Sequence, residues 1–207
     1  MAVHIVDHPL VQDALVQLRD ARTPPDRFRR AARRISVLLA AEALRDVPSQ
    51  PTTVETPLGP ATGRVAGDDL VVVPVLRSGL GMLDAVLELA PRARVGYVGL
   101  QRDELTAIPS QYYAKLPPDL GNTLVMLIDP MLATGGSAVA ALDVLARANA
   151  RTIRMVCIVA APEGIETVTR HAPHVDIFTP VIDRELDGDK FIVPGLGDFG
   201  DRLYGTS

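Results

Sequence analysis

The sequence predicts an α/β fold: a mostly parallel β-sheet flanked by helices, with N-terminal helices and a small β hood. From Leu70 onward, short apolar runs alternate with segments of helical spacing. Each run is apolar throughout, as expected of parallel strands that helices cover on both faces. The 207 residues, 47% of them hydrophobic, suffice for a single domain, 1–207, with a sizeable core. The predicted strands are 70–76, 94–100, 123–128, 153–160 and 175–179.

The segments before these strands predict two helices and a hairpin. Apolar residues recur at helical spacing in 10–19 and in 24–45. The second helix also carries a cluster of arginines, which we interpret as a solvated face or a subunit contact without chemistry of its own. Two short β-like pieces between Thr52 and Val65 flank a turn of proline and glycine, so we expect a hairpin apart from the main sheet.

Two long segments interrupt the alternation of strands and helices. Residues 101–122 are too many for an ordinary connection, so we expect a lid loop there that carries Arg102. The segment 183–207 is rich in glycine and aspartate and has little periodicity. Because this segment follows the last predicted strand, we expect it to form most of a hood over a ligand site. The hood as a whole would span approximately residues 180–207.

The segment Asp129–Ser137 is the most informative part of the chain. It follows an apolar strand pattern and leads into a helical pattern at 138–148. A helix start leaves main-chain N–H groups without partners and carries a partial positive charge, and the two adjacent glycines of this segment let an anion approach closely. Thr134 adds a hydroxyl donor, and the carboxylate of Asp129, at a strand end, suits the vicinal hydroxyls of a sugar. The segment predicts a site for a phosphorylated sugar.

Two common nucleotide-binding motifs do not describe this segment. It lacks the lysine of the G-x-x-x-x-G-K-[ST] loop, which disfavours a nucleotide-hydrolysing enzyme, and it lacks the G-x-G-x-x-G fingerprint of dinucleotide binding. A tight strand-to-helix turn that binds no ligand would use the same two glycines. Taken alone, the segment leaves that alternative open.

The composition argues against several other classes of protein. Its 21 Lys and Arg against 25 Asp and Glu give a net charge of -4, so no basic field favours nucleic acid. The single cysteine, Cys157, lies in an apolar run, which indicates a buried thiol and excludes an internal disulfide. The histidines lack metal-ligand spacing. Without a leader pattern or a run of about 20 apolar residues, we expect no membrane association and a cytoplasmic location.

Five separated segments follow one another in order along the chain: 73–84, 95–104, 129–137, 159–164 and 192–202. Together they resemble the uracil phosphoribosyltransferase family. The resemblance runs from about Val3 to Thr206 and disfavours a turn that binds nothing, since five ordered motifs are more specific than one glycine-rich loop. It implies the type I phosphoribosyltransferase fold. The implied activity is transfer of the 5-phosphoribosyl group of phosphoribosyl pyrophosphate (PRPP) to uracil, giving UMP and pyrophosphate in pyrimidine salvage.

The resemblance also implies site residues. The catalytic set is Arg77, Arg102 and Asp129, in which the arginines contact pyrophosphate and the carboxylate contacts the ribose hydroxyls. The PRPP-binding set contains these three residues together with Pro130, Met131, Leu132, Ala133, Thr134, Gly135, Gly136, Ser137 and Asp198, and residues 134–137 hold the 5-phosphate. The uracil-binding set, which acts largely through main-chain groups, is Ile192, Gly197, Asp198 and Phe199.

The resemblance implies partners as well. Mg²⁺ is the implied cofactor, held mainly by PRPP and water, with Asp198 as the protein ligand to consider. A homodimer or higher homo-oligomer is expected. GTP is an allosteric effector of some family members, although no residue of this sequence identifies a site for it.

The implied roles agree with the chemistry of the reaction. Breaking the bond from the anomeric carbon to pyrophosphate leaves negative charge on the leaving group, which the bidentate guanidinium of arginine stabilises. Ser78 and Phe199 stand where alanine is common in the family, and Phe199 could narrow the uracil pocket. Two alternative functions therefore stay open: a non-catalytic regulatory protein that binds UMP or PRPP, and phosphoribosyl transfer to another nucleobase.

Overall fold

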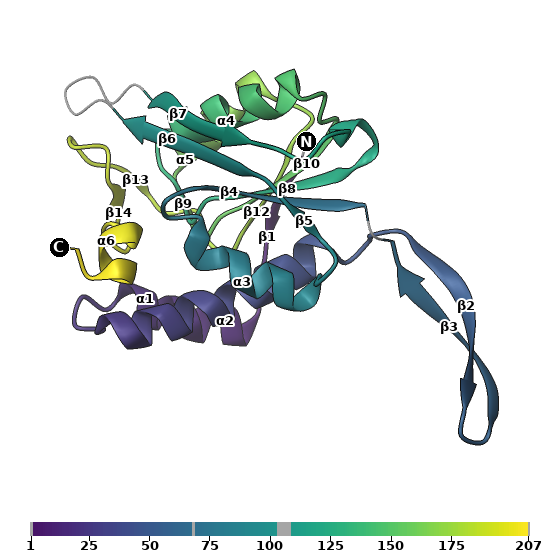
Figure 1. The fold of residues 1–207 in the computed structure, drawn as a ribbon. Coiled ribbons are helices and arrows are strands. Elements are labelled where there is room, and N and C mark those ends of the chain that lie inside the picture. The colour runs from purple at the N-terminus through teal and green to yellow at the C-terminus, as the bar shows by residue number, and fades with distance from the viewer. Residues whose placement is uncertain (1, 68, 103–108, 207) are drawn as a thin grey trace.

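The computed structural model describes residues 2–67, 69–102 and 109–206 and shows a β-sheet with helices on both faces (Figure 1). The helices are α1 (Pro9–Arg19), α2 (Pro25–Ala43), α3 (Leu80–Leu89), the 3-10 helix η1 (Leu120–Asn122), α4 (Gly136–Arg147), α5 (Pro162–His171) and α6 (Phe199–Tyr204). The strands are β1 (Val3–Ile5), β2 (Ser49–Thr56), β3 (Gly59–Ala66), β4 (Leu70–Leu76), β5 (Arg94–Val95), β6 (Tyr97–Arg102), β7 (Pro109–Lys115), β8 (Leu124–Ile128), β9 (Met131–Leu132), β10 (Thr152–Val156), β11 (Val159–Ala160), β12 (Asp176–Thr179), β13 (Glu185–Leu186) and β14 (Ile192–Val193).

The main sheet confirms the predicted fold class. Its strand order is β1-β12-β10-β8-β4-β6-β7, and β5 also pairs with β4. The pairings along this path are parallel except for the last, in which β7 runs antiparallel to β6. Parallel neighbours require crossover connections, and the helices between the strands supply them on the two faces. The carboxyl ends of β4 and β8 consequently open on one edge of the sheet.

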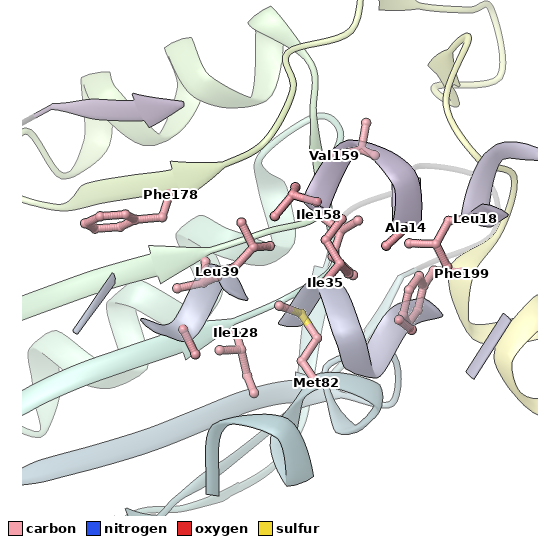
Figure 2. Close-up of a cluster of buried hydrophobic side chains, with 14 of the residues drawn as sticks. Ala14, Leu18, Ile35, Leu39, Met82, Ile128, Ile158, Val159, Phe178 and Phe199 are labelled. Carbon is pink, nitrogen blue, oxygen red and sulfur yellow. The ribbon is translucent and has the colours of Figure 1, made fainter. Parts of the chain in front are cut away.

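The sheet divides the core into two layers. Successive side chains of a strand point to opposite faces, so Val72 and Met126 pack with α1, α2 and α3, whereas Val71 and Val125 pack with α4 and α5. Figure 2 shows the first layer, in which Ile35 of α2 lies between Met82 of α3 and the side chains that follow β10. None of the helices in the described ranges is long and apolar enough to span a membrane.

Most predicted elements are present. The strand at 70–76 has the predicted bounds, and the two N-terminal helices are α1 and α2. The hairpin expected between Thr52 and Val65 is formed by β2 and β3, which pair antiparallel and extend away from the sheet (Figure 1). The predicted strands 94–100 and 153–160 are each divided in two. The first is interrupted at Gly96, although β5 and β6 both pair with β4. The second changes partner after Val156, since β10 pairs with β8 and β12 whereas β11 pairs with β9.

Two parts of the prediction were wrong. The segment 101–122, expected to be a loop, contains β7, which continues a ribbon with β6 from Pro109 to Lys115. Residues 110–115 of that strand are exposed, so the sequence lacks the apolar run by which the buried strands were predicted. Strand β1 was not predicted either, because it is short and two of its three residues are exposed; it pairs with β12 at the edge of the sheet.

Candidate active site

A cavity of about 310 Å³ lies at the carboxyl ends of β4 and β8. One wall is the chain that follows these strands, and the opposite wall is the hood, which consists of the β13–β14 hairpin and the start of α6. Open α/β sheets bind ligands at this edge. The lining residues are Val75, Leu76, Ser78, Leu100, Asp129, Met131, Ala133, Ser137, Asp189, Lys190, Phe191, Ile192, Gly197, Asp198, Phe199 and Gly200.

The turn from β8 to α4 has the geometry of an anion site. Gly135 precedes the first residue of α4 and adopts φ 83°, a left-handed conformation that favours glycine. A Cβ at this position would lie 2.8 Å from the Cβ of Thr167. The Gly136 N–H donates to the hydroxyl of Thr134 at 3.4 Å. The turn thus presents the N-terminus of a helix of 12 residues to the cavity, next to the side chain of Ser137.

Helix α5 supports this turn from behind. The Ala161 N–H donates to the carbonyl of Leu132 at 2.8 Å, just before α5 begins at Pro162. Gly164, in the first turn of α5, packs so closely that a Cβ there would lie 2.4 Å from the carbonyl oxygen of Ala133. The segment 159–164, which carries part of the family resemblance, therefore positions the turn from β8 to α4 and does not itself line the cavity.

Asp129 follows directly after β8 and lines the cavity although its exposed fraction is only 6%. Its main-chain N–H donates to the carbonyl of Val156 at 3.2 Å, which fixes the residue against β10. The hydroxyl of Ser78 donates to its Oδ1 at 3.3 Å. The carboxylate thus faces the cavity beside a serine from the loop after β4.

The loop after β4 carries Arg77. This residue is exposed and is not among the residues that line the cavity, whereas its neighbours Leu76 and Ser78 line it. The peptide bond between Leu76 and Arg77 is cis. The hydroxyl of Tyr204 donates to the Arg77 carbonyl at 3.4 Å, and burial raises the pKa of this tyrosine. The loop is therefore held against α6.

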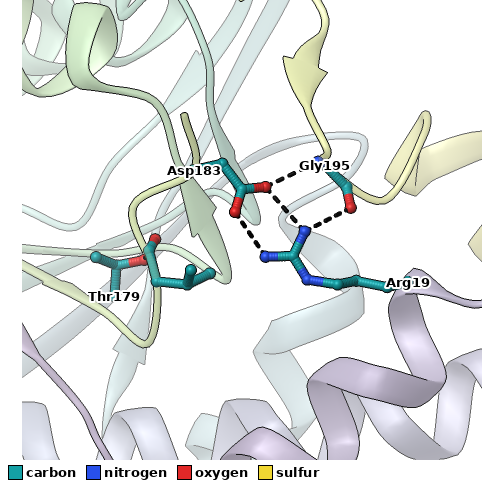
Figure 3. A network of polar contacts seen from close by, with 5 residues as sticks. Arg19, Thr179, Asp183 and Gly195 are labelled. Atoms are coloured by element: carbon teal, nitrogen blue, oxygen red, sulfur yellow. Dashed lines mark hydrogen bonds and ion pairs between the residues drawn. The ribbon is translucent and has the colours of Figure 1, made fainter. Parts of the chain in front are cut away.

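A polar network fastens the hood to α1. The guanidinium of Arg19 donates to both carboxylate oxygens of Asp183, at 2.9 and 2.6 Å, and to the carbonyl of Gly195 at 2.8 Å (Figure 3). Asp183 in turn accepts the N–H of Gly195 at 2.8 Å. Bidentate pairs of this kind fix orientation as well as distance. The main chain leading to Gly197 is thereby held at the cavity.

Arg202 fastens the following residues. Its guanidinium donates to the carbonyl of Leu196 at 2.7 Å and to that of Asp20 at 2.6 Å, and it also donates to the carbonyl of Leu18. The same group lies 4.5 Å from the ring centroid of Phe28. Burial lowers the pKa of this guanidinium. Asp198 caps α6 by accepting the Asp201 N–H at 2.8 Å, so its carboxylate is fixed at the rim of the cavity.

The cavity brings together eight of the predicted site residues. Phe199 has two roles, since it lines the cavity and its ring packs edge-on against Phe28 in the core, with centroids 5.3 Å apart. The predicted residues that line the cavity are Asp129, Met131, Ala133, Ser137, Ile192, Gly197, Asp198 and Phe199.

The remaining predicted residues do not line the cavity. Pro130 and Leu132 are buried in the turn, and Gly135 faces α5. Thr134, Gly136 and Arg77 are at least partly exposed. The backbone of Arg102 ends β6, but its side chain lies outside the described residues, as do residues 103–108 of the expected lid.

Sequence reasoning missed the hood residues Asp189, Lys190 and Phe191, which also line the cavity. The hood as a whole was predicted, but no pattern distinguished these turn residues from any other polar turn. The described residues contain no group of three or more His, Cys, Asp or Glu side chains arranged to hold a metal ion. Carboxylates of Asp129, Asp189 and Asp198 nevertheless line one cavity, and hard oxygen donors are the ligands that Mg²⁺ prefers.

Comparisons with known proteins agree with this geometry. A family model described as uracil phosphoribosyltransferase matches residues 5–206. The chain is 49% identical over 205 residues to a uracil phosphoribosyltransferase of Halalkalibacterium halodurans, covering 99% of this chain and 98% of the relative. It is 51% identical over 205 residues to one of Dictyoglomus thermophilum, covering 99% of each chain.

Solved structures show the same fold. A protein of Aquifex aeolicus superposes with a TM-score of 0.94 at 35% sequence identity, covering 100% of this chain and 99% of the other. An adenine phosphoribosyltransferase of Trypanosoma brucei superposes with a TM-score of 0.56 at 14% identity, covering 89% and 84% of the two chains, which supports the fold alone. With its sequence matched from end to end, the chain belongs to the uracil phosphoribosyltransferase family.

Proposed function

We propose that this chain transfers the 5-phosphoribosyl group of PRPP to uracil, giving UMP and pyrophosphate. The observation that supports this most directly is that residues of the turn 129–137 and of the hood segment 192–198 line the same cavity. A phosphorylated sugar fits the turn, and a planar base fits the space beneath the hood. Family membership over the whole chain supports the same reaction in pyrimidine salvage.

The residues around the cavity suit that chemistry. As the anomeric bond breaks, the sugar becomes positive and the leaving pyrophosphate negative, so catalysis depends on placed charges more than on a covalent nucleophile. In this proposal Asp129 binds the ribose hydroxyls, and the turn before α4 binds the 5-phosphate through main-chain N–H groups and the hydroxyls of Thr134 and Ser137. Arg77 and Arg102 stabilise the pyrophosphate from the loop after β4 and the end of β6.

The hood supplies the specificity for the base. Main-chain groups near Ile192 and Gly197 can pair with the polar edge of uracil, and the Arg19 and Arg202 contacts hold that chain in place. An amide donor that meets the amino group of cytosine would be left unpaired, and a buried unpaired donor disfavours the wrong base. Phe199 closes the pocket from the core side.

Mg²⁺ is part of this proposal. Asp129 and Asp198 offer carboxylate oxygens to one cavity, which suits an ion bound through one or two carboxylates together with phosphates and water. The ion, when bound with PRPP, neutralises charge on the pyrophosphate. Removing Mg²⁺ with EDTA should abolish turnover, and adding MgCl₂ should restore it.

The deciding experiment is an assay with several bases in parallel. The purified chain is incubated with PRPP, MgCl₂ and either uracil, cytosine, adenine, guanine or hypoxanthine, and nucleotide formation is measured. UMP from uracil alone supports the proposal. A product from a different base would support transfer to another nucleobase. Binding of UMP without any product would support the non-catalytic regulatory protein.

A homo-oligomer, at least a dimer, is also proposed. The β2–β3 hairpin leaves Val54, Leu58 and Val65 exposed, with Leu58 at 100%. A two-stranded hairpin is marginal in water without further cover, and a second copy of the chain would provide that cover. GTP as an effector and a cytoplasmic location stay predictions; titration of the assay with GTP tests the first, and cell fractionation tests the second.

A further inference from the structure

The cavity carries more negative than positive charge on its described residues, although its proposed ligand is an anion. Asp129, Asp189 and Asp198 line it, and among the described lining residues Lys190 alone is cationic. The exposed Arg77 is not in the lining. PRPP carries three phosphate groups, so its binding requires positive charge near the diphosphate in addition to the ion that accompanies it.

The turn of the hood fixes the main chain of Lys190, whose side chain is exposed. The Lys190 N–H donates to the carbonyl of Asp187 at 3.0 Å, and the Asp187 carboxylate accepts the N–H groups of Asp189 and Phe191 at 3.0 and 2.8 Å. The backbone of Lys190 is left-handed, with φ 67°, a conformation in which glycine would cost less. The backbone is thus ordered at the residue that carries the charge.

PRPP carries a 5-phosphate at one end and a diphosphate at the other, and the cavity offers different groups to each. The 5-phosphate is already served by the N-terminus of α4 and by the hydroxyl of Ser137. On the side of β4 and β6, the described lining offers Ser78 and the apolar residues Leu76 and Leu100, without a cation. Leu100 lies two residues before the end of β6, and Lys190 lines the same cavity from the hood.

We propose that the ammonium group of Lys190 binds the diphosphate of PRPP and of the product pyrophosphate, as a binding residue supplied by the hood. This inference rests on the proposed function. Among the described residues the Lys190 ammonium has no hydrogen-bond or ion-pair partner, so it is available to a ligand. The hood would then recognise both substrates, with main-chain groups for the base and Lys190 for the leaving group.

The test uses the full chain with Lys190→Met and Lys190→Gly. Methionine removes the charge and keeps much of the side-chain length, whereas glycine also suits φ 67°, so loss of folding cannot explain a common effect of the two variants. We expect the KM for PRPP and the inhibition constant of pyrophosphate to rise about tenfold in both. The KM for uracil should stay within about twofold, and Lys190→Arg should recover most of the affinity.

The chain offers a matched control. Lys115 is the other lysine of the sequence and lies exposed on β7, paired with Tyr97 at the end of the β6–β7 ribbon away from Arg102. Lys115→Met removes the same charge and should leave all these constants unchanged. If it raises the KM for PRPP as much as Lys190→Met does, the effect comes from net charge and the proposal is wrong.

Binding measurements separate the outcomes further. Calorimetric titration with UMP should give the same Kd for wild type and Lys190→Met, because UMP lacks the diphosphate. If Lys190→Met lost as much affinity for UMP as for PRPP, Lys190 would not bind the diphosphate specifically and the proposal would be wrong. It would also be wrong if pyrophosphate inhibited Lys190→Met and Lys190→Gly as strongly as it inhibits the wild type. If the wild-type chain forms no nucleotide with any base, the proposed function fails. Titration with pyrophosphate and MgCl₂ then still tests Lys190.

Discussion

Gly135 shows how one residue determines the form of the turn from β8 to α4, which we propose binds phosphate. Its φ of 83° and its distance from Thr167 both exclude a side chain, since an added Cβ would lie 2.8 Å from the Thr167 Cβ. Gly135→Ala should therefore displace the turn and lower kcat/KM by at least about 100-fold, with a lower Tm. Steady-state kinetics and thermal unfolding measure both effects.

The hairpin provides the control for that substitution. Gly63 on β3 has an ordinary φ, and a Cβ there meets nothing within 4 Å. Gly63→Ala should leave activity and Tm near the wild-type values. Wild-type activity in Gly135→Ala would show that the turn tolerates a side chain, which would contradict the claim that its geometry requires glycine at this position.

Cys157 was predicted to be a buried thiol, and the structure confirms this. Its exposed fraction is 0%, and burial raises its pKa from 9.0 to about 12. A thiol reagent at pH 8 should therefore fail to label the folded chain and should label it fully in urea, because the thiolate is the reactive form. Rapid labelling under native conditions would contradict the buried position.

The same pKa shift predicts a pH dependence of stability. An acid whose pKa is higher in the folded state stabilises the fold fully below its unfolded pKa, here about 9, and this contribution is lost as pH rises toward 12. The difference in free energy of unfolding between wild type and Cys157→Ala should narrow from pH 8 to pH 10. Urea unfolding at several pH values measures it, and a constant difference would contradict the assignment.

At the scale of elements, the hydrogen bonds that Arg19 of α1 makes to Asp183 and Gly195 of the hood should control binding of the base. The side chain of Asp183 is only 4% exposed, so Arg19→Met leaves a buried carboxylate without its partner. We expect a loss of about 3 kcal/mol in the free energy of unfolding. The KM for uracil should rise about tenfold, because the carbonyl of Gly195 loses the hydrogen bond from Arg19 that holds the main chain leading to Gly197.

An exposed pair serves as the control for this prediction. Arg170 and Glu166 on α5 are bonded at 2.5 Å with side chains 72% and 70% exposed. Exposed pairs contribute little, so Arg170→Met should change neither stability nor the KM for uracil. An Arg19→Met variant that unfolds earlier with an unchanged KM would mean that the network stabilises the fold and does not position the base.

The elements also show why sequence predicts some strands better than others. Strand β4 is buried on both faces and reads as an unbroken apolar run, so its bounds follow from the sequence. Strand β7 is exposed from residue 110 onward and owes its existence to pairing with β6, which no local pattern records. The turn at Gly135 was predictable because two adjacent glycines stand between an apolar strand pattern and a helical pattern. The place of Lys190 was not, because it depends on how the hood folds back over the sheet.

At the scale of the whole molecule, the hairpin is the element to remove. A chain in which residues 51–64 are replaced by Asn-Gly keeps the base of the ribbon, which the Gly67 N–H closes by donating to the carbonyl of Pro48 at 2.9 Å. If a second copy covers the hairpin, this variant should be monomeric with an intact sheet. Light scattering coupled to gel filtration and far-UV circular dichroism measure the two properties. A wild-type chain that is already monomeric, or a variant that still assembles, would contradict the proposed role of the hairpin.

The pairing of β1 with β12 has a consequence for how the chain is made. Val3 pairs with Ile177, and Arg19 bonds to Asp183, which lies 164 residues later, so these two contacts join segments that the ribosome makes far apart in time. A nascent chain can form its local helices early, but it cannot pair β1 with β12 or attach the hood to α1 until Ile177 and Asp183 have been made. An interrupted translation product would therefore keep β1 and α1 without these partners, exposed to chaperones and proteases, and would have no completed binding site.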